Sequence, residues 1–124
     1  MRDISCDVIA RSVAQLCVEA NRHLPARVRT LLEKAREAEP FAPALDTLSL
    51  ICQNADIAAA QSLPICQDTG MAVVYAEVGQ EVHIAGGLLE DAVNEGVRCG
   101  YTDGYLRKSV VGDLSLIHIS EPRD

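Results

Sequence analysis

The sequence predicts an α+β fold in which helices outnumber strands. Apolar residues recur three and four positions apart over four long segments, which is the period of an amphipathic helix. Between the third and fourth segments the pattern changes to short runs rich in β-branched residues, which favour strands. With 48% hydrophobic and only 3% aromatic residues, the 124-residue chain can build one aliphatic core. The expected order is three helices, a short β-hairpin, a helix and a strand.

The first half of the chain predicts three helices. The first covers residues 5–21, where Ser5 can cap the first turn, and the second follows Pro25, a residue suited to the start of a helix. The third begins near Phe41 and should end at about Gln61. Its apolar stripe is the clearest in the sequence and consists of Phe41, Leu45, Leu48, Ile51, Cys52, Ala55 and Ala59.

The second half predicts strands on either side of a helix. The runs "MAVVYAEV" (71–78) and "EVHIA" (81–85) are joined by "GQ", which indicates a hairpin. The helical period returns from Leu88 to Tyr101, and Glu90 and Asp91 lie near the positive N-terminal end of that helix. After the Asp103-Gly104 turn, "YLRKSVV" predicts a further strand.

Composition excludes several classes of protein. A net charge of −7 and a pI near 4.8 leave no basic stripe for nucleic acid. No apolar run approaches the roughly 18 residues of a membrane span, and the charged N-terminus does not resemble a signal peptide. The five cysteines form no CxxC pair and are odd in number, which argues against a disulfide framework and a zinc site. We therefore expect a cytoplasmic protein without nucleic-acid or membrane partners.

The last eleven residues, "LSLIHISEPRD" (114–124), differ from the rest of the chain. They resemble the in-frame translation of a transposon-type sequencing adapter, and no turn chemistry joins them to "SVVGD". We expect residues 1–113 to be the biological segment and residues 114–124 to be a non-native tail. His118 is accordingly given no role. The alternative is an ordinary C-terminal strand.

The segment "LPICQDTG" is the most unusual in the sequence. Cys66 follows Pro64 in a loop and precedes side chains that donate or accept hydrogen bonds, a setting typical of a metal-bound or reactive thiolate. The alternative is that "DTG" only caps a turn. Asp-Thr-Gly also occurs in aspartic proteases, but there it follows a hydrophobic strand and requires a second copy. The other cysteines, Cys6, Cys17, Cys52 and Cys99, lie on helices, where a packing role is expected.

Together, "PICQDTG" and the later "YLRKSVV" resemble the N-terminal region of the class I, iron-sulfur fumarate hydratases. The likeness is to the α subunit of the two-subunit bacterial type and extends from the first helix through Asp113. The tartrate dehydratase α subunit shares the "CQDTG" core but is less similar around "VGQEVHIAGG" and "YLRKSVV". The resemblance implies that the chain is the N-terminal fragment of a larger hydro-lyase domain.

The resemblance also implies roles for individual residues. Cys66 matches one of three thiolates that hold a 4Fe-4S cluster whose fourth iron is open to substrate. Gln67 and Asp68 match residues that contact the bound dicarboxylate or its hydroxyl, with Asp68 the candidate catalytic residue, and Arg107 matches an arginine that binds a substrate carboxylate. Thr69 and the glycine after it are expected to shape the loop.

The implied reaction is the reversible hydration of fumarate to (S)-malate. An open iron can act as a Lewis acid, a guanidinium can hold a carboxylate bidentately, and a carboxylate with a tuned pKa can relay a proton. The other two cluster cysteines and an "NTGDN"-like segment have no match in this sequence. A β subunit or C-terminal domain is expected to supply the base in a hetero-oligomer, and this chain alone is expected to be inactive.

Two alternatives remain at this point. One is a tartrate or other hydroxy-dicarboxylate dehydratase α subunit. The other is a helical interaction module in which Cys66 is only a packed thiol, which predicts a stable monomer that is indifferent to substitution of Cys66.

Overall fold

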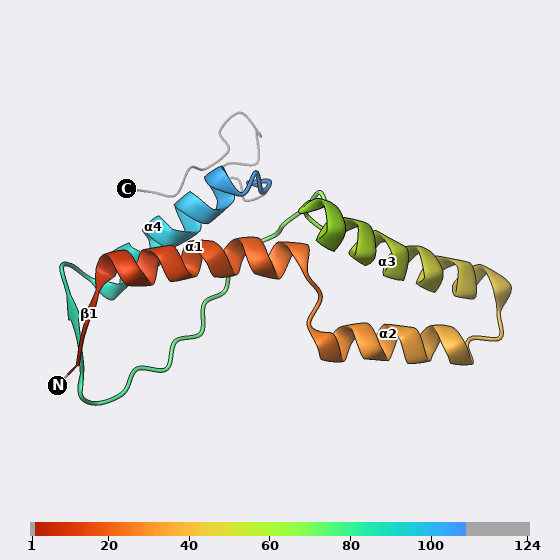
Figure 1. Ribbon diagram of the computed structural model, residues 1–124, viewed down its shortest axis with the longest axis horizontal. Helices are drawn as coiled ribbons and strands as arrows, with labels where there is room; N and C mark the ends of the chain where they lie inside the picture. Colours follow the sequence, from red (N-terminus) through yellow and green to blue (C-terminus); the bar gives the residue numbers. More distant parts are fainter. Residues whose placement is uncertain (1, 109–124) are drawn as a thin grey trace, which may run out of the picture. The chain divides into compact units, whose positions relative to one another are not determined.

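The computed structural model describes residues 2–108, which form four helices and two strands (Figure 1). The chain divides into two compact units, one made of Met1–Glu19 and Gln67–Asp124 and the other of Ala20–Cys66. The elements in chain order are β1 (Arg2–Ser5), α1 (Cys6–Arg22), α2 (Ala26–Ala38), α3 (Ala42–Gln61), β2 (Val82–Ala85) and α4 (Leu89–Asp103). The α+β prediction is therefore confirmed. The proposed tail, residues 114–124, lies outside the described residues.

The four predicted helices are confirmed, with ends close to those expected from the periodicity. The Ser5 hydroxyl accepts a hydrogen bond from the Val8 amide at 3.4 Å, which is the predicted cap at the start of α1. Pro25 directly precedes α2, and its carbonyl accepts from the Arg29 amide at 3.0 Å. Within residues 2–108, no helix is both long and apolar enough to cross a membrane.

The predicted hairpin was wrong. β2 lies within the predicted 81–85 strand, but it pairs in parallel with β1, in the register Arg2 with Val82 and Ser5 with Ala85. Residues 71–78, all of them described, form no strand. The physical reason is that a strand needs a neighbour for its backbone N–H and C=O groups, and β2 takes β1 instead. Of the predicted final strand, residues 105–108 are not in a strand and residues 109–111 lie outside the described residues.

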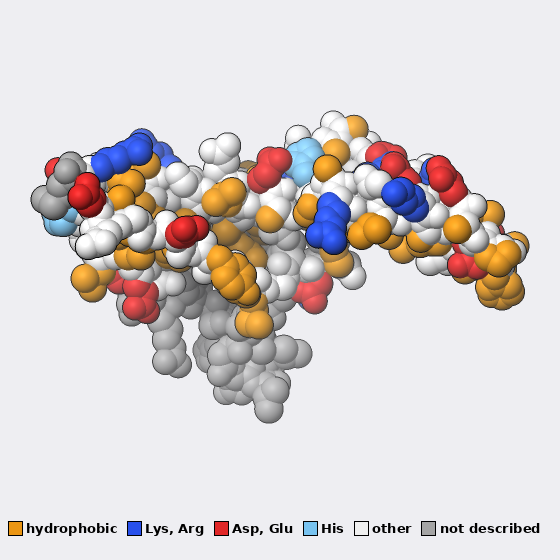
Figure 2. Space-filling model, turned by 90° about the horizontal axis from the view of Figure 1, so that it is seen from below, with side chains coloured by type: hydrophobic (Ala, Val, Ile, Leu, Met, Phe, Trp, Pro, Cys, Tyr) orange, Lys and Arg blue, Asp and Glu red, His pale blue; other side chains and the backbone are white. Residues whose placement is uncertain are grey.

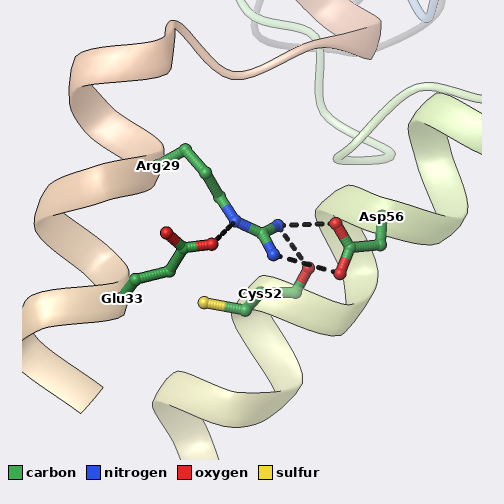
Figure 3. Close-up of polar contacts among 4 residues, drawn as sticks. All are labelled: Arg29, Glu33, Cys52 and Asp56. Carbon is green, nitrogen blue, oxygen red and sulfur yellow. Dashed lines mark hydrogen bonds and ion pairs between the residues drawn. The ribbon is translucent and has the colours of Figure 1, made fainter. Parts of the chain in front are cut away.

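In the unit Ala20–Cys66, α2 and α3 lie side by side as an antiparallel helical pair (Figure 1). The guanidinium of Arg29 on α2 connects the two helices (Figure 3). Its nitrogens donate to both carboxylate oxygens of Asp56 at 2.7 and 3.1 Å, to the Cys52 carbonyl at 3.0 Å and to Glu33 at 2.7 Å. The two carboxylates raise the pKa of Arg29, so the group stays charged. Only a planar guanidinium, with several N–H donors in a fixed arrangement, can make all these hydrogen bonds at once.

Replacing Arg29 with Lys is expected to lower the melting temperature slightly. An ammonium keeps the charge but cannot reach the two Asp56 oxygens and the Cys52 carbonyl together. The measurement is thermal unfolding followed by circular dichroism. Arg27→Lys on the same helix is the control, and equal melting temperatures for the two variants would contradict the connecting role of Arg29.

In the other unit, α1 packs against α4 around a core of Val13, Cys17, Tyr101 and Leu106. The helices approach closely because α4 carries glycines at the contact. A Cβ atom built on Gly96 would lie 2.5 Å from the Ala10 carbonyl oxygen, and one on Gly100 would lie 2.8 Å from the Ala14 carbonyl oxygen. Real side chains do not tolerate such distances, so the backbones of the two helices touch almost directly.

Large apolar side chains also remain on the surface of the described residues. Figure 2 shows hydrophobic side chains interspersed with acidic and basic ones. Among the most exposed are Leu16, Phe41, Leu50, Met71, Val73, Tyr75, Leu88 and Tyr105. Three of these lie in the predicted strand 71–78, where the side chain of Tyr75 is 92% exposed. The segment therefore has the composition of a buried strand without being buried here.

Candidate functional site

The backbone leading to Cys66 is fixed by residues of the α2–α3 unit. α3 ends at Ser62, which has a left-handed φ of 56°, and the Leu63 amide donates to the Ala58 carbonyl at 3.0 Å. The amide of Ile65 then donates to the Asn21 carbonyl at 2.8 Å, and its carbonyl accepts from the Asn54 side chain at 2.7 Å. The backbone amide and carbonyl of Ile65 are thus both hydrogen-bonded. The next residue, Cys66, has an exposed side chain.

The loop that follows makes a tight turn that is closed by the carboxylate of Asp68. The Gly70 amide donates to Asp68 Oδ1 at 3.3 Å, and Gly70 has a φ of 64°, a conformation that glycine adopts without strain. The contact expected of a simple turn cap is therefore present. Gln67 and Asp68 are nevertheless exposed residues.

Thr69 connects this loop to the residues after α4. Its hydroxyl donates to the Arg107 carbonyl at 2.6 Å, and its own carbonyl accepts from the Tyr101 hydroxyl at 3.2 Å. Because Thr69 follows Asp68 directly, the structure brings the backbone of Arg107 next to the loop that carries Gln67 and Asp68. The side chain of Arg107 is exposed. Three of the four predicted site residues are thereby gathered within one compact unit.

The chain reaches this position through an unusual turn. Tyr105 has a φ of 55°, which is uncommon for a residue other than glycine. The turn sends Leu106 back into the core, where it is 5% exposed and its amide donates to the Tyr101 carbonyl at 3.0 Å. Arg107 comes next, at the surface.

Sequence reasoning missed two contributors to this arrangement. Thr69 was expected only to shape its loop, and Tyr101 was expected only as the end of the helical period that begins at Leu88. Tyr101 is buried, and a buried tyrosine usually finds a hydrogen-bond partner for its hydroxyl, so its place within the helical period offered a signal. That partner, the carbonyl of Thr69, could not be deduced from spacing.

The other four cysteines are held on helices. The packing prediction is confirmed for Cys17 and Cys52, which are buried, and burial raises the pKa of the Cys17 thiol. The Cys6 thiol donates to the Leu88 carbonyl at 3.8 Å. The Cys99 thiol donates to Glu95 at 3.3 Å, and that carboxylate raises the pKa of Cys99, which favours the protonated thiol. Across residues 2–108, no three His, Cys, Asp or Glu side chains gather to hold a metal ion.

A shallow hollow of about 440 Å³ lies elsewhere, along β1 and the start of α1. It is lined by Arg2, Asp3, Ile4, Ser5, Val8 and Ala85. None of the predicted site residues lines it, so it is not part of the candidate site.

Known proteins resemble this chain over most of its length. The family described as "Fumarate hydratase (Fumerase)" matches residues 10–121. A provisionally named L(+)-tartrate dehydratase subunit alpha of Methanocaldococcus jannaschii is 32% identical over 86% of the chain. A class I fumarate hydratase of Geobacillus stearothermophilus, also provisionally named, is 31% identical over 84%. The aerobic class I fumarate hydratase of Escherichia coli K12 is 46% identical over 52%.

The matched segment is only part of each relative. It spans 38% of the Methanocaldococcus protein, 20% of the Geobacillus protein and 12% of the Escherichia protein. The family match nevertheless includes every predicted site residue from Cys66 to Arg107. The chain therefore belongs to the fumarate hydratase (Fumerase) family of hydro-lyases.

Proposed function

We propose that the protein to which this chain contributes is a hydro-lyase that interconverts fumarate and (S)-malate. The observation that carries the proposal is the 2.6 Å hydrogen bond from Thr69 to the Arg107 carbonyl, because it unites the two halves of the predicted substrate site. Family membership supplies the reaction class. In this proposal, Gln67, Asp68 and Arg107 contribute part of a dicarboxylate pocket.

Arg107 is the proposed carboxylate anchor. Its exposed guanidinium can form two parallel hydrogen bonds to one carboxylate of the substrate, which fixes orientation as well as charge. Gln67 presents an amide that can donate to the other carboxylate or to the hydroxyl of malate. These contacts would hold the double bond of fumarate in one orientation for addition of water.

Asp68 is the proposed proton-handling group. In the hydration direction, the oxygen of water bonds to one alkene carbon, a proton leaves that water, and a proton is added to the other carbon. Asp68 would accept or hold the proton of the hydroxyl, since it is an exposed residue whose carboxylate is oriented by the Gly70 amide. The group that donates the proton to carbon in this direction, and removes it as a base in the reverse direction, is assigned to a β subunit or C-terminal domain.

Cys66 is the proposed cluster ligand. Iron-sulfur clusters take cysteine thiolates, and Cys66 offers an exposed thiol on a backbone fixed at the preceding residue. When bound, a 4Fe-4S cluster would supply an open iron as a Lewis acid for the substrate hydroxyl. The other four cysteines are buried or hydrogen-bonded on helices, so we assign the remaining two ligands to sequence outside this chain. The chain alone is then expected to be inactive.

A tartrate dehydratase is the second candidate, because the relative with that name matches 86% of the chain. The test is anaerobic reconstitution of the full-length protein with its β partner, followed by turnover of fumarate, (S)-malate and L(+)-tartrate. Preferred turnover of fumarate and malate supports the proposal, and preferred turnover of tartrate overturns it in favour of the second candidate. A stable monomer without activity on any dicarboxylate would instead favour the helical interaction module.

A further inference from the structure

We infer that Thr69 is a positioning residue that sets the place of the Arg107 guanidinium in the substrate site. The inference rests on the proposed function, in which Arg107 binds a substrate carboxylate. Thr69 itself lies between the proposed substrate residues in the chain and in space, and its hydroxyl is already engaged with the Arg107 carbonyl. It therefore acts through Arg107 rather than on the substrate.

The backbone of Arg107 is anchored from two sides. The preceding residue, Leu106, is buried in the α1–α4 core, and its amide is bonded to the Tyr101 carbonyl at 3.0 Å. The carbonyl of Arg107 itself is bonded to the Thr69 hydroxyl at 2.6 Å. With both sides fixed, the guanidinium can vary its position only through its own side-chain torsions. The range of positions open to a carboxylate bound by Arg107 would then be narrower.

Thr69 is itself anchored to the same core. Its carbonyl accepts from the hydroxyl of Tyr101, whose side chain is 8% exposed and packs with Val13 and Leu106. Three hydrogen bonds thus link the loop, the arginine and α4 in a triangle: Thr69 hydroxyl to Arg107 carbonyl, Tyr101 hydroxyl to Thr69 carbonyl, and Leu106 amide to Tyr101 carbonyl. Loss of the Thr69 hydroxyl would leave Arg107 held from one side only. It would also leave the Arg107 carbonyl to bond to water.

Positioning and mere structural support predict different kinetics. If Thr69 positions Arg107, its loss weakens carboxylate binding, so KM rises while kcat for each intact active site changes little. If Thr69 only stabilises the fold, fewer molecules are active, and KM keeps its wild-type value. Small displacements of a binding group are sufficient for a measurable effect on affinity.

The experiment uses the full-length protein assembled with its partner. Thr69→Val is expected to raise the KM for fumarate roughly tenfold with unchanged iron content, and Thr69→Ser, which keeps the hydroxyl, is expected to restore it. Thr47→Val is the matched control, because the Thr47 hydroxyl also donates to a carbonyl, that of Pro43 at 2.9 Å, but within α3. Amide hydrogen exchange should increase at residues 105–108 in Thr69→Val alone.

Each outcome decides something. A wild-type KM together with wild-type exchange in Thr69→Val overturns the inference and leaves the proposed function intact. A wild-type protein that turns over no dicarboxylate overturns the proposed function, and the exchange data then still decide whether Thr69 holds Arg107. If Thr69→Val does not fold, Tyr101→Phe removes the hydroxyl that donates to the Thr69 carbonyl. Its control is Tyr75→Phe at an exposed position, and equal KM values for these two variants would overturn the inference.

Discussion

Cys66→Ser in the full-length protein, assembled anaerobically with its partner, is expected to lower hydration of fumarate by more than about a hundredfold. A serine hydroxyl is not deprotonated near neutral pH and is a poor ligand for iron-sulfur iron, so the cluster would lose one of its three protein ligands. The measurements are the rate of malate formation and the iron content per protein.

Cys99→Ser is the control for this experiment. Cys99 donates its thiol proton to Glu95, a bond that a serine hydroxyl can also make, so activity and iron content should stay near wild type. Wild-type iron content and activity in Cys66→Ser would contradict the ligand assignment. Loss of both in Cys99→Ser as well would show that any change of a cysteine disturbs the protein.

Gly96→Val is expected to destabilise the folded chain by about 3 kcal/mol and to lower its Tm by more than about 10 °C. The added Cβ would lie 2.5 Å from the Ala10 carbonyl oxygen and 2.7 Å from the Val13 Cβ atom, so α1 and α4 would have to separate. Helix propensity works slightly in the opposite direction, because valine is a better helix former than glycine. Thermal unfolding followed by circular dichroism measures the difference.

The control is Gly79→Val, where a Cβ atom would meet only Val82 Cγ2 at 3.7 Å, an ordinary contact distance. We expect its Tm to differ little from that of the wild type. An unchanged Tm for Gly96→Val would show that the two helices can move apart at little cost, contrary to the close backbone packing described above.

The helices could be predicted because their signal is local. The apolar positions of α1 and α3 repeat within each helix, and Ser5 lies next to the turn it caps. The pairing of β1 with β2 could not be predicted, because strand pairing depends on residues far apart in the chain. β1 is only four residues long, two of them charged, and nothing in "RDIS" indicates that it will pair with Val82–Ala85.

The candidate site shows the same division. Cys66, Gln67 and Asp68 are consecutive, so their common placement follows from the sequence alone. The approach of Arg107 depends on a hydrogen bond from Thr69 to a backbone carbonyl, and a carbonyl carries no sequence signal. The left-handed conformation of Tyr105 was equally hidden, because that conformation is rare for tyrosine.

The glycine contacts between α1 and α4 have a consequence for the position of Arg107. Tyr101 lies in the last turn of α4, and the turn that carries Arg107 follows this helix, so the spacing of α1 and α4 helps to determine where the arginine lies. A side chain at Gly96 or Gly100 would push the two helices apart without touching Gln67, Asp68 or Arg107. Substitutions at these two glycines are therefore expected to shift the position of Arg107 as well as to destabilise the fold.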